Sequence, residues 1–268
     1  TTTTVAIVGV TAGESLVGID FRPATGQLYA LGVNAASDNG TIYRLDPQTG
    51  AATVAVTGTE GAIAFVAADG VTAVDLPDPA TAGYGFDFNP TVDRIRVTTS
   101  TGLNFRMNQI TGAAVDGDTV GLGTNPDGAI NGSSVTGVSG AAYTNSVAST
   151  PMTPQSITTL YALSEAGSQL TIQNAPNAGT QTVPLTVRLG GTTLVFTSVN
   201  GFDIPSDVRV SANNAAVTSG SGFAALTVAG VTSLYRIDLA TGAATNLGAV
   251  GSGAAALRGL TVGQTHAR

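Results

Sequence analysis

A repeat of about 66 residues is the feature of this sequence that most constrains its fold. Four related segments begin at residues 27, 93, 159 and 224, so successive steps are 66, 66 and 65 residues. They are Gln27–Leu31, Asp93–Val97, Thr159–Leu163 and Ala224–Val228. A second related segment follows each of them, at Ile42–Asp46, Asn104–Asn108, Leu170–Asn174 and Leu234–Asp238. Self-similarity at a fixed period predicts a repeat architecture.

Each repeat has the pattern of short strands joined by tight turns. In the first repeat, Leu16–Pro23 alternates apolar and small or polar residues, which is typical of a β-strand with one buried face. Further strands are expected at 28–33, 41–45 and 51–56, because Gly, Pro, Asp and Asn cluster between them. The repeat is therefore predicted to be a four-stranded antiparallel meander.

The first strand of the repeat also recurs. Gly18–Pro23 resembles Gly85–Pro90, Gly201–Pro205 is a shorter version, and Gly140–Tyr143 and Gly259–Val262 are degenerate ones. The spacing of these strands is less even, so long loops or extra hairpins are expected at 57–82, 116–137, 145–156 and 205–222.

The pattern predicts an all-β fold, a β-propeller-like array of four-stranded antiparallel repeats, with residues 1–268 in a single domain. The period exceeds the ~40–50 residues of an ordinary blade. Either each blade carries an extra hairpin, which gives four blades, or degenerate blades lie between regular ones, which gives five or six. A β-sandwich or an open β-array is the alternative. The terminal strands 4–10 and 257–262 are expected to pair and close the ring.

Composition excludes several classes of function. Only 10% of the residues are charged, the ten basic residues are all arginine, and the formal net charge is −7. The absence of a basic run excludes an electrostatic nucleic-acid interface. No apolar run reaches the ~18–20 residues of a membrane helix, so membrane insertion is not expected. There is no cysteine for disulfides or thiolate metal sites.

Several segments of the repeats resemble a known family. Gly18–Tyr29 followed by Tyr43–Gly50 is similar to a bacterial family of secreted proteins known as a domain of unknown function, and Tyr84–Pro90 and Leu234–Thr245 fit the same pattern. The resemblance implies an extracellular or cell-surface location and supplies no site residues. A start at Thr1-Thr2-Thr3-Thr4, without methionine, fits a processed N-terminus.

Three aspartates stand at equivalent places in the repeated first strand: Asp20, Asp87 and Asp203. In one interpretation they lie near the ring axis and converge on a cation. In the other, each accepts hydrogen bonds from a neighbouring turn or pairs with an arginine such as Arg22, because buried carboxylates need partners. Recurrence in several repeats favours the structural interpretation.

A second candidate site lies in a glycine-rich loop. Asp116, Asp118, Asn125 and Asp127 offer the carboxylate and amide oxygens that calcium prefers, although their spacing matches no EF-hand. Calcium is the one cofactor that the sequence suggests, and an ordinary turn is the alternative.

No catalytic constellation is recognisable. His266, the one histidine, is the third residue from the C-terminus, and terminal residues seldom hold a catalytic imidazole. Tyr29, Tyr43, Tyr161 and Tyr235 recur in the repeats and are expected in the core. Tryptophan, the usual platform for sugars, is absent.

The sequence therefore favours a non-catalytic extracellular or cell-surface protein with a structural or adhesive role. Its terminal strands could join copies of the chain into a polymer by strand addition. Two alternatives remain open: an acidic-channel, calcium-dependent hydrolase or lyase, and a carbohydrate-binding module that recognises extracellular glycans.

Overall fold

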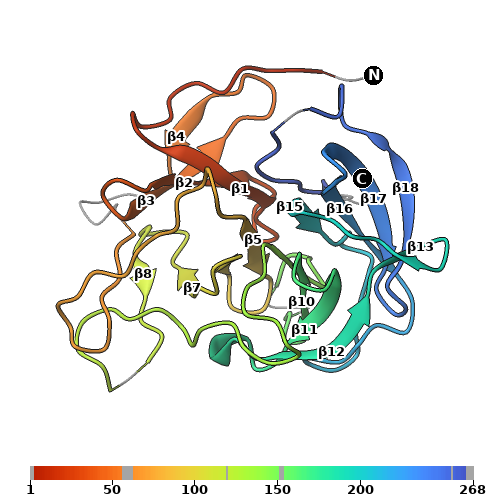
Figure 1. The fold of residues 1–268 in the computed structure, drawn as a ribbon. Helices are drawn as coiled ribbons and strands as arrows, with labels where there is room; N and C mark the ends of the chain where they lie inside the picture. The colour runs from red at the N-terminus through yellow and green to blue at the C-terminus, as the bar shows by residue number, and fades with distance from the viewer. Residues whose placement is uncertain (1–2, 56–62, 119, 151–153, 255, 264–268) are drawn as a thin grey trace.

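The structure is a computed structural model that describes residues 3–55, 63–118, 120–150, 154–254 and 256–263, and it is a β-propeller of four blades (Figure 1). The predicted all-β class is confirmed, with the smallest of the expected blade numbers. Within the described ranges the one helical element is the 3-10 turn η1 (Pro176–Ala178).

The first two blades are regular meanders with the strand order of the sequence. Blade 1 consists of β1 (Ser15–Phe21), β2 (Leu28–Asn34), β3 (Asn39–Leu45) and β4 (Ala52–Val54). Blade 2 consists of β5 (Tyr84–Asn89), β6 (Arg94–Thr99), β7 (Asn104–Met107) and β8 (Ala114–Val115). Every pairing in these two sheets is antiparallel.

The last two blades follow the same plan, with one addition. Blade 3 consists of β9 (Gly140–Tyr143), β10 (Leu160–Ser164), β11 (Gln169–Gln173) and β12 (Gln181–Thr186). Blade 4 consists of β15 (Ser198–Asp203), β16 (Ser221–Val228), β17 (Val231–Asp238) and β18 (Ala243–Ala249). A short hairpin of β13 (Arg188–Leu189) and β14 (Thr192–Thr193) extends this sheet, since β13 pairs in parallel with β18. Long connections and this hairpin account for the length of the repeat.

The core lies between the faces of neighbouring blades. One apolar cluster joins blades 1 and 2, where the rings of Tyr29 and Phe88 meet edge to face at 5.2 Å. A larger cluster joins blades 3 and 4. Tyr29, Tyr43, Tyr161 and Tyr235 are all buried, as the sequence predicts. Since each sheet buries its faces only against its neighbours, the repeat needs a ring.

The first strands of the blades form a ring with five places, not four. Each copy of the repeated strand begins with a glycine, and this glycine packs against the next copy around the ring. The residue that it contacts there is the one that follows the next copy's own glycine. A Cβ atom added to the first glycine would lie 3.0 Å or less from that residue. For Gly18 the distance to the Cβ atom of Phe86 would be 2.4 Å. The successive contacts are Gly18 with Phe86, Gly85 with Ala141, Gly140 with Phe202, Gly201 with Leu260, and Gly259 with Ile19. The C-terminal segment 259–262 therefore occupies a fifth place between blade 4 and blade 1.

The expected pairing of the two terminal strands is wrong. The N-terminal segment lies against the outer edge of blade 1, where the Val8 N–H donates to the Gly50 carbonyl at 3.0 Å. The Ala52 N–H donates to the Val8 carbonyl at 2.7 Å. Segment 257–262 runs instead along the ring axis without joining a sheet. The reason is that its glycine and side chains fit the inner ring, a contact that strand patterning does not encode.

Candidate functional site: the axial aspartates

The three aspartates of the repeated strand meet at the ring axis. Asp20, Asp87 and Asp203 come from β1, β5 and β15, and one carboxylate oxygen from each lies within 4.8 Å of the others. All three side chains are buried, at 7%, 2% and 5% exposure. The strands position them because Gly and Asp, two residues apart on a strand, share a face, and the ring turns that face toward the next place.

Each aspartate links its own place in the ring to the next one. Asp20 accepts the Phe88 N–H at 3.0 Å, and Asp87 accepts the Tyr143 N–H at 3.2 Å. Asp203 accepts the Val262 N–H of the C-terminal segment. Thus part of the structural interpretation is confirmed, since carboxylates from three blades bond backbone groups of the following place. The convergence on the axis is confirmed as well.

Blade 3 is the exception to this pattern. Blade 3 carries Ala142 where the other blades carry aspartate. Ala142 cannot accept a hydrogen bond from the following place, and the Ile204 N–H there is satisfied by the Asp203 carboxylate at 2.6 Å. Buried N–H groups that lack a partner are costly, so a neighbouring side chain supplies one.

Thr261 completes the cluster and was missed by reasoning from the sequence. Its hydroxyl bonds to Asp20 at 2.9 Å and to Asp203 at 3.0 Å. Thr261 stands in the degenerate strand Gly259–Val262 at the position of the aspartates. That alignment was the available signal, and a hydroxyl in place of a carboxylate conceals it.

Burial makes it costly to ionise this cluster. Burial raises the pKa of Asp203 to about 6. Burial and then the charge of Asp203 raise the pKa of Asp20 well above its usual value. For Asp87, burial and then the charges of Asp20 and Asp203 raise the pKa well above the usual value. Three carboxylates this close in a dry site cannot all be charged without protons or a cation between them.

The donor set is suited to a hard divalent cation. Carboxylate and hydroxyl oxygens are ligands that Ca²⁺ and Mg²⁺ accept. A hollow of about 10 Å³ lies beside the cluster, lined in part by Asp20, Asp203 and Ser146. A space of that size holds one water or ion. Asp20, Asp87 and Asp203 could therefore hold such a cation.

The predicted pairing of these aspartates with an arginine is wrong. Arg22 donates from Nε to Asp93 at 2.9 Å and forms an ion pair with it. Arg22 follows the end of β1 and begins the turn that the Gly26 N–H closes on its carbonyl, so its side chain contacts Asp93 of the next blade. Among the described residues, no ion pair involves the axial aspartates.

In the glycine-rich loop the predicted ligands have other partners. Asp127 forms two bonds to Arg106, at 2.8 and 2.7 Å, and an ion pair with the buried Arg96. Asp118 accepts the backbone N–H groups of Val120 and Gly121.

The remaining two candidates bond each other or nearby carbonyls. The Asp116 carboxylate accepts the Asn125 N–H at 3.0 Å, and the Asn125 amide donates to carbonyls of Val66, Ala67 and Leu122. In the described part of the chain, the one cluster of three carboxylates close enough to share an ion is the axial one. Calcium binding by the loop stays a prediction, with its most buried carboxylate already neutralised by two guanidinium groups.

Two further sequence expectations concern His266 and membrane insertion. His266 lies outside the described residues. No helix in the described part of the chain has the length and apolar character to cross a membrane.

The chain belongs to the family DUF4394, a domain of unknown function, whose family model matches residues 1–261. None of the curated proteins matches it. Among solved structures, one similar chain is described as "Crystal structure of BBS1N in complex with ARL6DN, soaked with lead", with 12% identity and a TM-score of 0.36. The match covers 88% of this chain and 56% of that chain, so this chain spans little more than half of its length.

Proposed function

We propose that this propeller is a non-catalytic extracellular or cell-surface protein with a structural or adhesive role, and that it assembles with copies of itself. The observation that carries the proposal is the fifth place of the inner ring. This place holds segment 259–262, yet no sheet extends outward from it in the described part of the chain. The outer faces of blades 1 and 4 therefore border a sector without a blade.

The face of blade 4 that borders this sector carries apolar side chains. Gly201, which contacts Leu260, pairs with Ala225, and Ala225 pairs with Leu234, so these residues share the bordering face. Leu234 is half-buried. Leu247, at the irregular pairing opposite Leu234, is 48% exposed. The half-buried Leu234 on this face and the exposed Leu247 beside it favour contact with another chain.

The opposite side of the sector is similar. On blade 1, Leu28 and Leu45 belong to a small apolar cluster that also includes Ile19, the contact of Gly259. A hollow of about 520 Å³ lies beside Leu28 and Leu45, and only residues of blade 1 line it. Two apolar faces thus lie on either side of the fifth place, where a blade would bury both.

The N-terminal segment is suited to supply strands to another copy. Ile7 and Val8 are 50% and 60% exposed, and a single bridge joins the segment to blade 1. Apolar side chains on a weakly paired strand favour strand addition to the sheet of a second copy. The lysine-free, low-charge surface supports an extracellular location for such an assembly.

The non-catalytic part of the proposal is supported by the axial site. The carboxyl groups with raised pKa, which could act as general acids, are buried, and the hollow beside Asp20 and Asp203 has room for one water or ion. A hydrolase or lyase would require these groups to face an open cleft.

Solution size tests the proposal. Light scattering and electron microscopy of the intact chain at rising concentration should reveal oligomers or filaments. Leu247→Asp should raise the protein concentration required for assembly at least tenfold, because it places a charge beside the bordering face. Deletion of residues 1–8 should have the same effect while leaving a folded monomer, since Val10 and the bond from Thr11 to Tyr43 remain.

The matched control is Val71→Asp, which adds the same charge at a residue that is 81% exposed. It should assemble as the intact chain does. A chain that stays monomeric at millimolar concentration would contradict the proposal, and so would equal assembly of the Leu247 and Val71 variants.

A further inference from the structure

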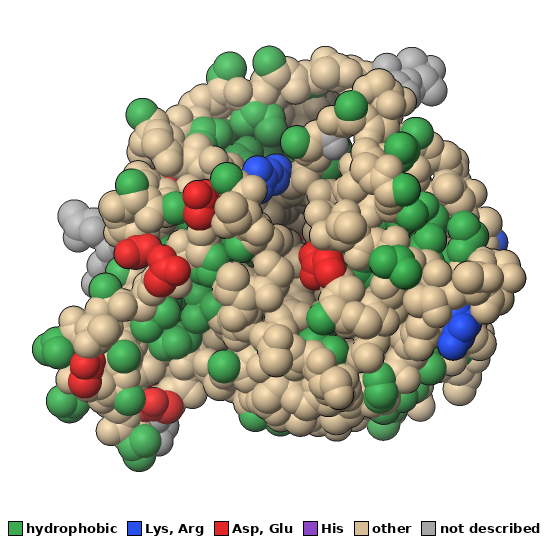
Figure 2. All heavy atoms as spheres, viewed as in Figure 1, with side chains coloured by type: hydrophobic (Ala, Val, Ile, Leu, Met, Phe, Trp, Pro, Cys, Tyr) green, Lys and Arg blue, Asp and Glu red, His purple; other side chains and the backbone are tan. Residues whose placement is uncertain are grey.

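A separate cavity opens at the other end of the ring axis. Figure 2 shows the ring hollowed at its centre, with an acidic and a basic side chain on opposite sides of the hollow. The cavity has a volume of about 450 Å³. It lies at the beginning of the inner strands, lined by Val17, Tyr84 and Ser198, whereas the axial aspartates stand at their ends. This volume is in the range of small-molecule sites, ~300–1,000 Å³.

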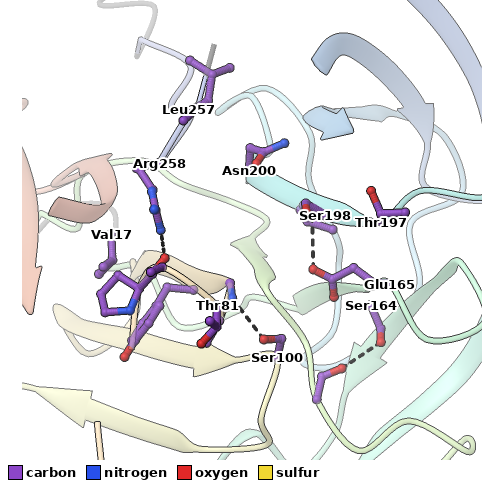
Figure 3. A pocket seen from close by; sticks show the side chains of 18 of the residues that line it. Val17, Thr81, Ser100, Ser164, Glu165, Thr197, Ser198, Asn200, Leu257 and Arg258 are labelled. Atoms are coloured by element: carbon purple, nitrogen blue, oxygen red, sulfur yellow. Dashed lines mark hydrogen bonds between the residues drawn. The ribbon is translucent and has the colours of Figure 1, made fainter. Parts of the chain in front are cut away.

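All four blades and the C-terminal segment contribute to the cavity wall. Most of the wall is uncharged, with hydroxyl groups from Thr81, Ser100, Ser164, Thr197 and Ser198 (Figure 3). Val17, Pro79 and Leu257 add apolar surface. A wall of hydroxyls with some apolar surface is suited to a polyhydroxylated ring, whose polar groups need partners when they leave water.

Glu165 supplies a fixed acceptor. Its Oε1 atom accepts the Ser139 hydroxyl and the Val199 N–H. These bonds hold the carboxylate at the wall, and among the described residues no hydrogen bond involves its second oxygen, Oε2. That oxygen can accept a hydroxyl of a ligand, which is a charge-assisted hydrogen bond.

Arg258 supplies the opposite charge. Figure 3 shows it across the cavity from Glu165, on the segment that follows Leu257. Its Nη1 atom donates to the Pro79 carbonyl. Within the described residues, Arg258 forms no ion pair. Its guanidinium group therefore retains donors in the fork geometry that matches a carboxylate.

We propose that this cavity binds a sugar acid, a ring of monosaccharide size that carries one carboxylate and several hydroxyls. The carboxylate pairs with Arg258, and the hydroxyls bond to Glu165 and to the serine and threonine side chains of the wall. Glu165 repels the ligand carboxylate, so the two charged residues together fix one orientation. The proposal does not depend on assembly, because no residue of the bordering faces lines this cavity.

Binding of glucuronate and galacturonate, measured by calorimetry or ligand-observed NMR, tests the proposal. At least one of the two should bind tenfold more tightly than glucose, which lacks the carboxylate, and than acetate, which lacks the hydroxyls. A trigalacturonate arm distinguishes the source: tighter binding than the monomer indicates the end of a glycan, and weaker binding indicates a free sugar.

Variants assign the residues. Arg258→Ala should reduce affinity for the sugar acid at least tenfold, and Arg258→Lys should have an intermediate effect because it keeps the charge and loses the fork. Arg188→Ala, at an exposed arginine outside the cavity, is the matched control and should bind normally. Glu165→Gln should weaken binding of the sugar acid, because the amide is a poorer acceptor for the ligand hydroxyls than the carboxylate. The same variant should strengthen binding of acetate, because the repulsion between two carboxylates is removed. Thermal melting establishes that each variant is folded.

Three results would overturn the proposal. The first is no binding of either sugar acid at 10 mM. The second is acetate binding as tight as that of the sugar acids, which indicates a plain anion site. The third is unchanged affinity in a folded Arg258→Ala variant.

Discussion

The carboxylate of Asp20 accepts the backbone N–H of Phe88 at 3.0 Å, although the two residues are 68 positions apart in the chain. This bond joins the inner strand of blade 1 to that of blade 2. Its counterpart joins Asp87 to Tyr143 in the next blade. The axial aspartates therefore hold the ring together, and the stability of the ring should depend on their charge.

The first prediction concerns pH. For Asp203 the pKa in the folded state is about 6, above its ordinary value of 3.8. A carboxyl group whose folded pKa is raised contributes stability that is fully present below 3.8 and is lost as the pH rises through 6. In the presence of a chelator, the free energy of unfolding should therefore fall between about pH 4 and pH 6, by on the order of 1–3 kcal/mol from this group.

Chemical denaturation at a series of pH values checks this. Asp203→Asn should flatten the profile in that window, and Asp207→Asn, at an exposed aspartate, should leave it unchanged. A profile that keeps its full slope in the Asp203 variant would be inconsistent with the raised pKa.

The second prediction concerns divalent cations. At pH 8 the axial carboxylates repel one another, so Ca²⁺ or Mg²⁺ between them should raise the melting temperature of chelator-treated protein. Asp87→Asn should remove this increase, because it takes away one charge of the cluster. Asp118→Asn tests the glycine-rich loop in the same way. If the Asp118 variant loses the response and the Asp87 variant keeps it, the loop and not the axis binds the ion.

The third prediction concerns the buried ion pairs at Asp127. Its carboxylate contacts Arg96, which is 2% exposed, and Arg106. Asp127→Asn should lower the free energy of unfolding by about 3–5 kcal/mol, because it leaves a buried guanidinium group without a counter-charge. Asp93→Asn, which removes the more exposed ion pair to Arg22, should cost below about 1 kcal/mol. Equal losses of unfolding free energy in the two variants, measured by urea unfolding, would contradict the expectation that the buried ion pairs contribute more to stability.

The fourth prediction tests the five-place ring. Gly18→Ala places a Cβ atom 2.4 Å from the Cβ of Phe86, so the two inner strands must separate. We expect a loss of about 1–3 kcal/mol in the free energy of unfolding. Gly263→Ala, where no heavy atom lies within 4 Å of the added Cβ, should be neutral. A Gly18 variant as stable as the control would show that the inner ring is loosely packed.

Much of the fold follows from local patterns in the sequence. Short strands separated by turn residues predict the antiparallel meanders that the structure contains. Examples are the strands Leu28–Asn34 and Arg94–Thr99. Recurrence of Gly-x-Asp predicts that Asp20, Asp87 and Asp203 have equivalent positions. These inferences succeed because strand alternation and turn chemistry act over a few residues.

The partners of the charged residues could not be predicted in the same way. Asp127 was placed among calcium ligands because of its neighbours in the chain, yet the structure pairs it with Arg96, 31 residues away. Arg22 was a candidate partner for the axial aspartates, and the structure pairs it with Asp93, 71 residues away. The counter-ion of Arg22 depends on how blades 1 and 2 pack, and that of Asp127 depends on how its loop folds over blade 2.

By itself, the sequence determined a ring of β-meanders with an aspartate in the inner strand of most blades, because its period and alternation leave few other ways to bury the apolar faces. Only the tertiary structure decided that the C-terminal segment takes a fifth place in the inner ring. It also decided that the Thr261 hydroxyl bonds to Asp20, 241 residues away. The physical reason is closure: the contact joins residues from opposite ends of the ring's chain path, and no local pattern in the sequence records it.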